Sequence, residues 1–383
     1  MNNFNFYNPT KVIFGKGNIG KLSQEIPAEA KIMITYGGGS IKNNGVYKQI
    51  VTALEGFDFI EFGGIEPNPK YETLMKAVEI VRNEGVDFLL AVGGGSIIDG
   101  TKFIAAATYF NGDPWDILTK GTEVTKALPL GVVLTIPATG SEMNARGVIT
   151  KIATKEKFAF YIPLIAPKFS ILDPSVAASL PVKQAANGVV DIFSHIIEQY
   201  LTYDVNHPLN DRFAEAILIT LVEEGPKYVA DTSNYDAAAN IMWAATMALN
   251  GLVGSGVPVD WSSHRIGHEI TALNNIDHGI TLAIVMPGVM SIMREEKKDK
   301  LLQYGQRVFN VSNGDEQSRI DETINKTVAF FQSLGVKTRL SDYNLGEETI
   351  NIIVQRFKDR KTVLGEHNNI TPEKVREILL DRL

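Results

Sequence analysis

Cysteine is absent from this 383-residue sequence. Disulfide bridges and thiolate metal ligands are therefore excluded, and any metal site must be built from oxygen and nitrogen ligands. No run of residues approaches the roughly 20 apolar positions that cross a bilayer, and the N-terminus lacks the basic start and apolar run of a signal peptide. We therefore expect a cytoplasmic protein that has no membrane partner.

An excess of positive charge is also lacking. The 37 lysines and arginines are outnumbered by 44 aspartates and glutamates, which gives a net charge of -7 and a pI near 5.5. Proteins that bind nucleic acid usually present a concentrated basic surface. We therefore expect no nucleic-acid partner.

The size and the apolar pattern indicate two domains. A chain of 42.0 kDa is too long for one ordinary core and favours two domains. The first half alternates apolar strand-like runs with helical patterns, which is the rhythm of a parallel, doubly wound sheet. The runs lie at residues 11–14, 31–36, 57–62, 87–92 and 131–137, and the clearest helical patterns at 71–85 and 97–110. After an expected β-hairpin the sequence becomes almost entirely helical, so we predict an α/β domain over residues 1–180 and an all-α domain over residues 181–383.

Two of the expected strands end in the same tetrapeptide. Gly-Gly-Gly-Ser occurs at residues 37–40 and again at residues 93–96, each time before an expected helix. Glycine permits close approach of a ligand to the backbone, and a helix N-terminus offers unpaired N–H groups to phosphate. Neither segment is the dinucleotide fingerprint GxGxxG, so each is equally consistent with a plain tight turn. The pair favours a Rossmann-like nucleotide site, and the lack of a carboxylate after the first turn favours NADP over NAD.

Four of the six histidines and one aspartate form two clusters in the sequence that suit a metal site. Asp191 and His195 are four residues apart in a helical segment, so both project from one face. An isolated pair of this kind is more often a helical ion pair or a buried histidine. His264, His268 and His278, however, occupy a single stretch of fifteen residues. Carboxylate and imidazole ligands suit a divalent ion such as zinc or ferrous iron in a catalytic site.

Spacing limits how these histidines can share one ion. His264 and His278 would be about 21 Å apart on an unbroken helix, so the chain must turn between them. Asn274, Asn275 and Asp277 provide suitable helix-stop and turn residues. Spacing alone leaves His264 and His268 as a rival pair. One histidine is left over, either to handle a proton or to make a hydrogen bond behind the ligands.

Four segments together resemble the iron-containing, or group III, alcohol dehydrogenase family: NPTKVIFGKG, AVGGGSIIDGTKFIA, TIPATGSEMN and HRIGHEITALNNIDHG. The YGGGS turn and the FGGIEPNP segment are similar to those of its NADP-dependent aldehyde reductase and butanol dehydrogenase branch. This resemblance implies that Asp191, His195, His264 and His278 bind the metal and that His268 is the spare, catalytic imidazole. The cofactor contacts that it implies are Gly38, Gly39, Ser40, Asn68, Gly94, Gly95, Ser96, Asp99, Thr135, Thr139, Asn144 and Lys157.

The resemblance also implies the reaction. It predicts reversible, NADP(H)-linked reduction of short-chain aldehydes to primary alcohols with one divalent ion, Fe²⁺ or Zn²⁺, in a homodimer. Residues 1–180 would bind NADP and residues 181–383 the metal. The alternatives are a glycerol-type polyol dehydrogenase, a dehydroquinate synthase-like lyase and, less favoured, a non-catalytic protein that binds metal or nucleotide. Trp115 and Trp261 are candidates for an apolar substrate pocket, and core packing explains each equally well.

Overall fold

The computed structural model describes residues 1–383, which fold into two compact units. The α/β unit comprises residues 7–181 and 231–246, and the helical unit comprises residues 1–6, 182–230 and 247–383. The main division lies one residue from the expected boundary. Two short segments, residues 1–6 and 231–246, fall on the other side of it. For the second, a helical pattern does not show which core a helix joins. Met242 of residues 231–246 packs in the core of the α/β unit, and Asn2 donates its backbone N–H to Gly256 in the helical unit.

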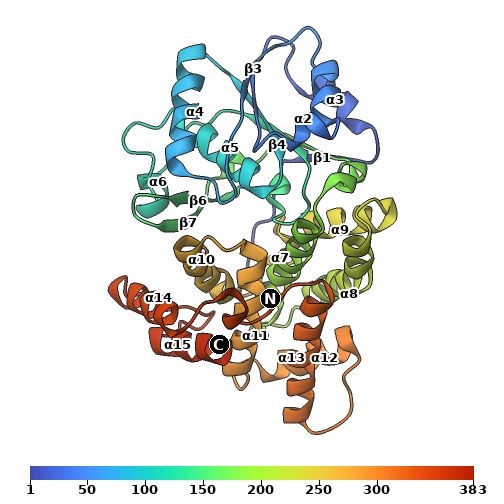
Figure 1. Ribbon diagram of the computed structural model, residues 1–383, viewed down its shortest axis with the longest axis vertical. Helices are drawn as coiled ribbons and strands as arrows, with labels where there is room; N and C mark the ends of the chain where they lie inside the picture. The colour runs from blue at the N-terminus through green and yellow to red at the C-terminus, as the bar shows by residue number, and fades with distance from the viewer. The chain divides into compact units, whose positions relative to one another are not determined.

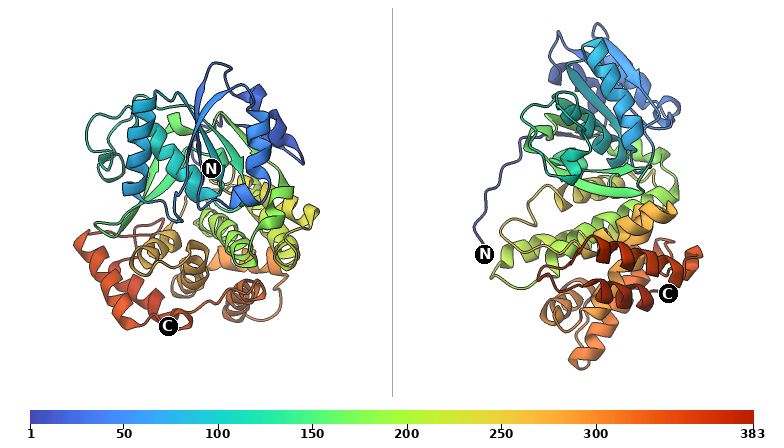
Figure 2. Two further views of the ribbon diagram at one scale, coloured as in Figure 1. Left: turned by 45° about the horizontal axis from the view of Figure 1, so that its top comes forward. Right: turned by 90° about the vertical axis from the view of Figure 1, so that its left-hand side faces the viewer.

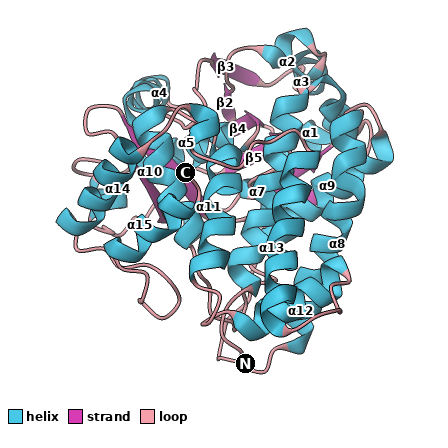
Figure 3. Cartoon of the chain, turned by 60° about the horizontal axis from the view of Figure 1, so that its bottom comes forward, coloured by secondary structure: helices cyan, strands magenta, loops and turns pink.

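A six-stranded, fully parallel sheet forms the centre of the α/β unit, as the sequence predicts (Figure 3, magenta). Its order is β1 (Lys11–Phe14), β8 (Phe169–Leu172), β5 (Leu130–Leu134), β4 (Phe88–Gly93), β2 (Lys31–Thr35) and β3 (Asp58–Phe62). Strand β8 was not expected, because its four residues follow the hairpin and lie outside the strand–helix alternation of residues 11–137. An antiparallel hairpin of β6 (Arg146–Lys151) and β7 (Glu156–Tyr161) confirms the other strand prediction.

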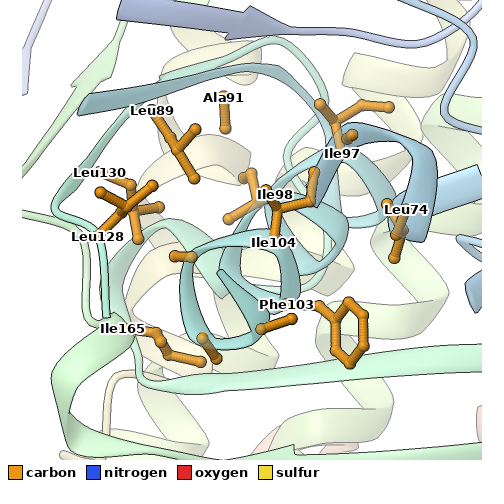
Figure 4. Close-up of a cluster of buried hydrophobic side chains, with 14 of the residues drawn as sticks. Leu74, Leu89, Ala91, Ile97, Ile98, Phe103, Ile104, Leu128, Leu130 and Ile165 are labelled. Carbon is orange, nitrogen blue, oxygen red and sulfur yellow. The ribbon is translucent and has the colours of Figure 1, made fainter. Parts of the chain in front are cut away.

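Helices cover both faces of this sheet. Successive side chains of a strand point to opposite faces, and in the central strands both sets are apolar and need cover. Leu89 and Ala91 of β4 join the core under α4 (Tyr71–Glu84) and α5 (Gly95–Ala107), which Figure 4 shows around Ile98. Leu90 and Val92 join the opposite core with α3 (Val46–Ala53). The remaining helices of this unit are α1 (Leu22–Glu25), α2 (Ser40–Asn43), α6 (Asp116–Thr119) and most of α9 (Tyr235–Ala248).

The strand order places the two glycine turns side by side. From β2 the chain passes to β3 on one side and then to β4 on the other, so the winding direction reverses between β2 and β4 (Figure 3; β3 and β4 are also labelled in Figure 1). Both glycine turns follow the carboxyl ends of these two strands. In open α/β sheets the crevice at such a reversal is where ligands bind. The topology therefore places both turns at the edge where sheets of this kind commonly bind ligands.

The helical unit is built around α11 (His278–Ile292), which is buried from Gly279 to Met290. It packs against α7 (Val182–Tyr200), α10 (Ser262–Asn274), α13 (Glu316–Ser333) and α15 (Pro372–Asp381). The other helices are α8 (Pro208–Ala230), α12 (Lys298–Phe309) and α14 (Glu347–Asp359). Residues 1–6 form no helix or strand and begin at the N label in Figure 2. No helix in either unit is both long and apolar enough to cross a membrane.

Candidate metal centre and nucleotide site

Three helices of the helical unit direct one carboxylate and three imidazoles toward a common point. Asp191 and His195 lie one turn apart on α7, His264 lies on α10, and His278 is the first residue of α11. The Oδ1 atom of Asp191 is 3.8 Å from Nε2 of His195, 3.7 Å from Nε2 of His264 and 3.8 Å from Nε2 of His278. The ligand atoms of the first three residues all lie within 4.8 Å of one another.

These separations fit a shared metal ion better than direct hydrogen bonds. Ligand bonds of about 2.0 to 2.2 Å in a tetrahedron place the ligand atoms roughly 3.4 Å apart. The observed 3.7 to 3.8 Å exceeds the normal hydrogen-bond range. Oδ1 of Asp191 and Nε2 of His264 are buried and have no hydrogen-bond partner. Because buried polar atoms are normally satisfied, these two atoms point to a cation between them.

The turn between α10 and α11 allows His264 and His278 to meet. Helix α10 ends at Asn274, and Asn275 follows it with a left-handed φ of 54°. Asparagine tolerates this conformation better than most residues and commonly ends a helix in this way. Helix α11 then begins at His278. The predicted turn is thereby confirmed.

Glu198 belongs to this site although sequence reasoning did not select it. Its Oε2 atom accepts a hydrogen bond from Nδ1 of His264, and its Oε1 atom accepts one from the backbone N–H of Ser263 at 2.5 Å. The first bond leaves Nε2 of His264 as the free ligand atom, an arrangement that is common behind metal-bound histidines. Glu198 follows Asp191 by seven residues on α7, and this spacing was the available signal.

The charges at the centre favour a cation. Burial alone would raise the pKa of Asp191, but His195, His264 and His278 hold it well below its usual range. Burial lowers the pKa of His195 to about 4, so its imidazole is neutral at pH 7 and has a lone pair to offer. Burial also opposes a charge on His264, yet Glu198 and Asp191 raise its pKa to about 9, so a metal ion bound here would take the place of its Nε2 proton. Two carboxylates thus draw positive charge to this point.

His268 and Trp261 lie beside the four converging side chains. His268 is buried on α10, with its ring centroid 5.1 Å from that of His278 and 6.3 Å from that of His264. Trp261 meets the ring of His264 edge-on at 5.4 Å. Trp115, in contrast, packs in the core of the α/β unit against Tyr71. Of the two tryptophans proposed for a substrate pocket, only Trp261 is next to the candidate metal centre.

The second glycine turn is closely packed against the segment that follows β5. A Cβ atom on Gly95 would lie 2.4 Å from Thr139, and one on Gly94 would lie 2.9 Å from Ile136. Thr135 donates its backbone N–H to the carbonyl of Gly93 at 3.0 Å. Helix α5 begins at Gly95, where its first N–H groups have no acceptor within the helix. The glycines here permit close packing at a helix N-terminus that suits phosphate.

Polar side chains from three other segments converge beside this turn. The backbone N–H of Asn68 donates to Oγ of Ser96 at 3.3 Å, and the Oδ1 atom of Asn68 accepts from Nζ of Lys157 at 2.9 Å. Asp99 accepts from Oγ of Ser141 at 2.6 Å and from the backbone N–H of Val148 at 2.9 Å. Both Asp99 oxygens thus hold neighbouring protein segments. Asn144 donates to the carbonyl of Gly140 at 2.8 Å.

The first glycine turn carries Gly38, Gly39 and Ser40 at the start of α2. Gly39 has a φ of 91°, which side chains disfavour, and a Cβ on Gly38 would meet open space. The segment itself has no carboxylate, but β3 brings Glu61 to the residues that flank the turn. Glu61 accepts hydrogen bonds from Lys42 at 2.7 Å, from Tyr36 at 2.9 Å and from Tyr47. Three donors therefore already occupy this carboxylate.

Comparison with known proteins bears on the whole chain. The family model described as iron-containing alcohol dehydrogenase matches residues 9–174. The model described as the C-terminal part of the Fe-containing alcohol dehydrogenase family matches residues 185–383.

Whole-length relatives agree with these matches. The chain is 53% identical to the NADPH-dependent aldehyde reductase YqhD of Escherichia coli (strain K12) over 99% of each chain. It is 42% identical to the probable NADH-dependent butanol dehydrogenase 1 of Bacillus subtilis (strain 168), again over 99% of each. The crystal structure of YqhD from E. coli K-12 superimposes with a TM-score of 0.98 at 52% identity, covering 100% of this chain and 99% of that one. The chain therefore belongs to the iron-containing alcohol dehydrogenase family.

Proposed function

We propose that this chain, an enzyme of the alcohol dehydrogenase and aldehyde reductase class, reduces short-chain aldehydes to primary alcohols with NADPH and catalyses the reverse reaction. The observation that carries the proposal is the convergence of Asp191 Oδ1 with three histidine Nε2 atoms at 3.7 to 3.8 Å. The name of the E. coli relative, an NADPH-dependent aldehyde reductase at 53% identity, supports the substrate class.

Asp191, His195, His264 and His278 are the proposed ligands of one divalent ion, Fe²⁺ or Zn²⁺. Both ions accept this mixture of carboxylate and imidazole, so the ligand set does not select between them. A bound ion supplies Lewis acidity to the carbonyl oxygen, where negative charge develops as hydride arrives. Glu198 keeps His264 in the required tautomer by accepting a hydrogen bond from its Nδ1–H group.

We propose His268 as the group that supplies a proton to the product oxygen. Its ring lies beside His278 and His264 but does not make the 3.7 to 3.8 Å approach to Asp191 that the other three make. Imidazole titrates near neutral pH and is suited to this role. Trp261 would exclude water from the same region through its apolar ring.

The α/β unit is the proposed nucleotide-binding part, and the helical unit the metal-binding and catalytic part. The proposed contacts at the first turn are Gly38, Gly39 and Ser40, and those at the second turn are Asn68, Gly94, Gly95, Ser96, Asp99, Thr135, Thr139, Asn144 and Lys157. Helix α5 offers its N-terminus to the pyrophosphate. NADPH is favoured over NADH because Glu61 is already held by Lys42 and two tyrosines, and so is poorly placed to bind a ribose hydroxyl. A homodimer in the cytoplasm remains part of the proposal.

One experiment tests the central proposal. NADPH and NADH oxidation are followed over a panel of aldehydes, and the metal content of the same preparation is measured. We expect turnover of short aliphatic aldehydes with NADPH preferred, and loss of turnover on chelation that one added divalent ion reverses. Full activity in metal-free protein would overturn the metal role. Preference for glycerol, turnover of a sugar-phosphate precursor, or binding without NADPH consumption would favour the polyol dehydrogenase, the lyase or the binding protein respectively.

A further inference from the structure

Lys102 is a completely buried lysine that the proposed chemistry does not use. It lies on α5, seven residues after Gly95 and on the same helix as the second glycine turn, with none of its surface exposed. Its Nζ atom donates to the carbonyl of Ser141 at 2.6 Å, to Oγ of Ser141 at 2.7 Å, to Oδ1 of Asn144 at 3.1 Å and to the carbonyl of Arg146 at 2.8 Å. Four acceptors surround three N–H donors, so the ammonium group is saturated.

All four acceptors belong to one short segment, residues 141–146. Apart from one turn of 3₁₀-helix at Ser141–Met143, this segment has no regular structure before β6 begins at Arg146. Backbone carbonyls in such a segment need partners from elsewhere when they are buried. Lys102 supplies partners for two of them and for the side chain of Asn144. It therefore ties the segment to α5 at three successive points.

The same segment forms one wall of the second glycine turn. Thr139, just before it, packs so closely on Gly95 that a Cβ there would lie 2.4 Å away. Ser141 accepts from Lys102 and donates to Asp99 at 2.6 Å, so a continuous chain of hydrogen bonds runs from Lys102 to Asp99. Asp99 in turn accepts from the backbone of Val148. Through these hydrogen bonds Lys102 helps to fix the positions of the residues around the N-terminus of α5.

Burial of this charge opposes folding, so its retention needs a reason. Burial lowers the pKa of Lys102 to about 8, against attraction from Asp99 and Glu142, and the ammonium form still predominates at pH 7. The residues that follow it on α5, from Phe103 to Ala107, are apolar and buried. An apolar side chain at this position would avoid the desolvation of an ammonium group but would leave two backbone carbonyls without partners.

We propose that Lys102 is a positioning residue for nucleotide binding: it holds residues 139–146 against the start of α5 in the arrangement that receives the pyrophosphate. This inference rests on the proposed nucleotide site at the second glycine turn. Lys102 itself touches no ligand. Its loss should therefore weaken nucleotide binding by displacing Thr139, Ser141 and Asp99, and should leave the metal centre in the helical unit intact.

The test compares two buried lysines. Lys102→Met is paired with Lys300→Met, which removes a lysine that is also buried and bonded to both oxygens of Asp211 at 2.6 Å, but in the helical unit. The dissociation constant of NADPH is measured by fluorescence titration, together with metal content and melting temperature. We expect both variants to melt at lower temperature and only Lys102→Met to bind NADPH at least about tenfold more weakly, since small displacements in a binding site are costly. Metal content should be unchanged in Lys102→Met.

Further variants keep the test decisive. Lys102→Arg retains the charge and the donors and should recover part of the lost affinity. If Lys102→Met fails to fold, Ser141→Ala carries the test, because it cuts the link to Asp99 while the backbone stays tied. We expect weaker NADPH binding and an unchanged metal content. If wild type and the tested variant bind NADPH equally, or if Lys300→Met weakens NADPH binding to the same extent, the role of Lys102 is overturned. The proposed function is not affected by either result. No NADPH binding by wild type overturns the proposed function as well.

Discussion

At the scale of single residues, the three histidines of the HRIGHEITALNNIDHG stretch differ in what they can do. His264 and His278 approach Oδ1 of Asp191, whereas the ring of His268 lies beside theirs at centroid distances of 6.3 and 5.1 Å. We therefore predict that His264→Ala abolishes stoichiometric metal binding, because it removes one of four ligands. His268→Ala should retain the metal and lose turnover by about 10²- to 10⁴-fold, the usual range for a general acid. Metal analysis after dialysis and the rate of NADPH oxidation measure the two effects separately.

The contrast between these two variants is what matters. If His268→Ala lost the metal, His268 would be a metal ligand in place of one of the four proposed ones. Full turnover by metal-loaded His268→Ala would assign protonation to another group.

Glu198 leads to a second prediction at this scale. Glu198→Gln removes the charge that holds the Nδ1 proton of His264 but keeps nearly the same shape. We expect metal affinity to fall by about 10- to 100-fold, as is common for residues that support a metal ligand. Competition with a chelator of known affinity gives the value.

Glu215→Gln is the matched control for that experiment. Glu215 is also a buried carboxylate of the helical unit, but its hydrogen bonds come from Tyr200, Gln303 and Arg307. An equal loss of metal affinity in both variants would show that general destabilisation, and not the bond to His264, is the cause.

Residue spacing accounts for part of the candidate centre and not for the rest. The i, i+4 pair Asp191 and His195 follows from helical geometry, and so does the need for a turn before His278. Spacing could not choose between His264 and His268, because each is compatible with one helix face. Glu198 shares a face with Asp191, but carboxylates are so common on helices that position alone does not mark it.

At the scale of elements, the sequence predicted the strands that are long enough to show a pattern. Strands β2, β4 and β5 are buried and largely apolar, and β3 at the edge is half-exposed. All four lie within three residues of their predicted limits. Strand β8 escaped prediction because Phe169–Leu172 is a four-residue run without flanking periodicity. Its place between β1 and β5 depends on long-range pairing, which local pattern does not contain.

The second glycine turn supports a prediction at this scale. Gly95→Ala places a Cβ atom 2.4 Å from Thr139, too close for any real contact, and Thr139 cannot move without displacing its segment. We expect the variant to bind NADPH at least about tenfold more weakly while it keeps its metal. Gly20→Ala is the control, because a Cβ there meets nothing within 4 Å, its φ is not left-handed and Gly20 is not a proposed nucleotide contact.

Fluorescence titration with NADPH measures both variants. Unchanged affinity in Gly95→Ala would mean that this turn does not bind the nucleotide.

At the scale of the whole molecule, tertiary packing decided what helical pattern could not. Residues 235–246 are helical as expected, yet they belong to the α/β unit. There Thr246 donates to Glu142 at 2.6 Å and Trp243 meets Phe14 edge-on. A helical period shows which face is apolar but not which core receives that face. The assignment of this helix therefore required three-dimensional structure.

The division into units also assigns the two proposed ligands, NADPH and the metal ion, to different units. All proposed nucleotide contacts lie in residues 7–181, and all proposed metal ligands lie in residues 182–230 and 247–383. We therefore predict that chelated protein, and His264→Ala, still bind NADPH with a dissociation constant within about threefold of wild type, a change of under 1 kcal/mol. A metal that binds only folded protein at 100 times its dissociation constant should add about 2.7 kcal/mol to the stability, so chelation should lower the melting temperature. Loss of NADPH binding on chelation would show instead that the metal shapes the nucleotide site, and the assignment of one ligand to each unit would be wrong.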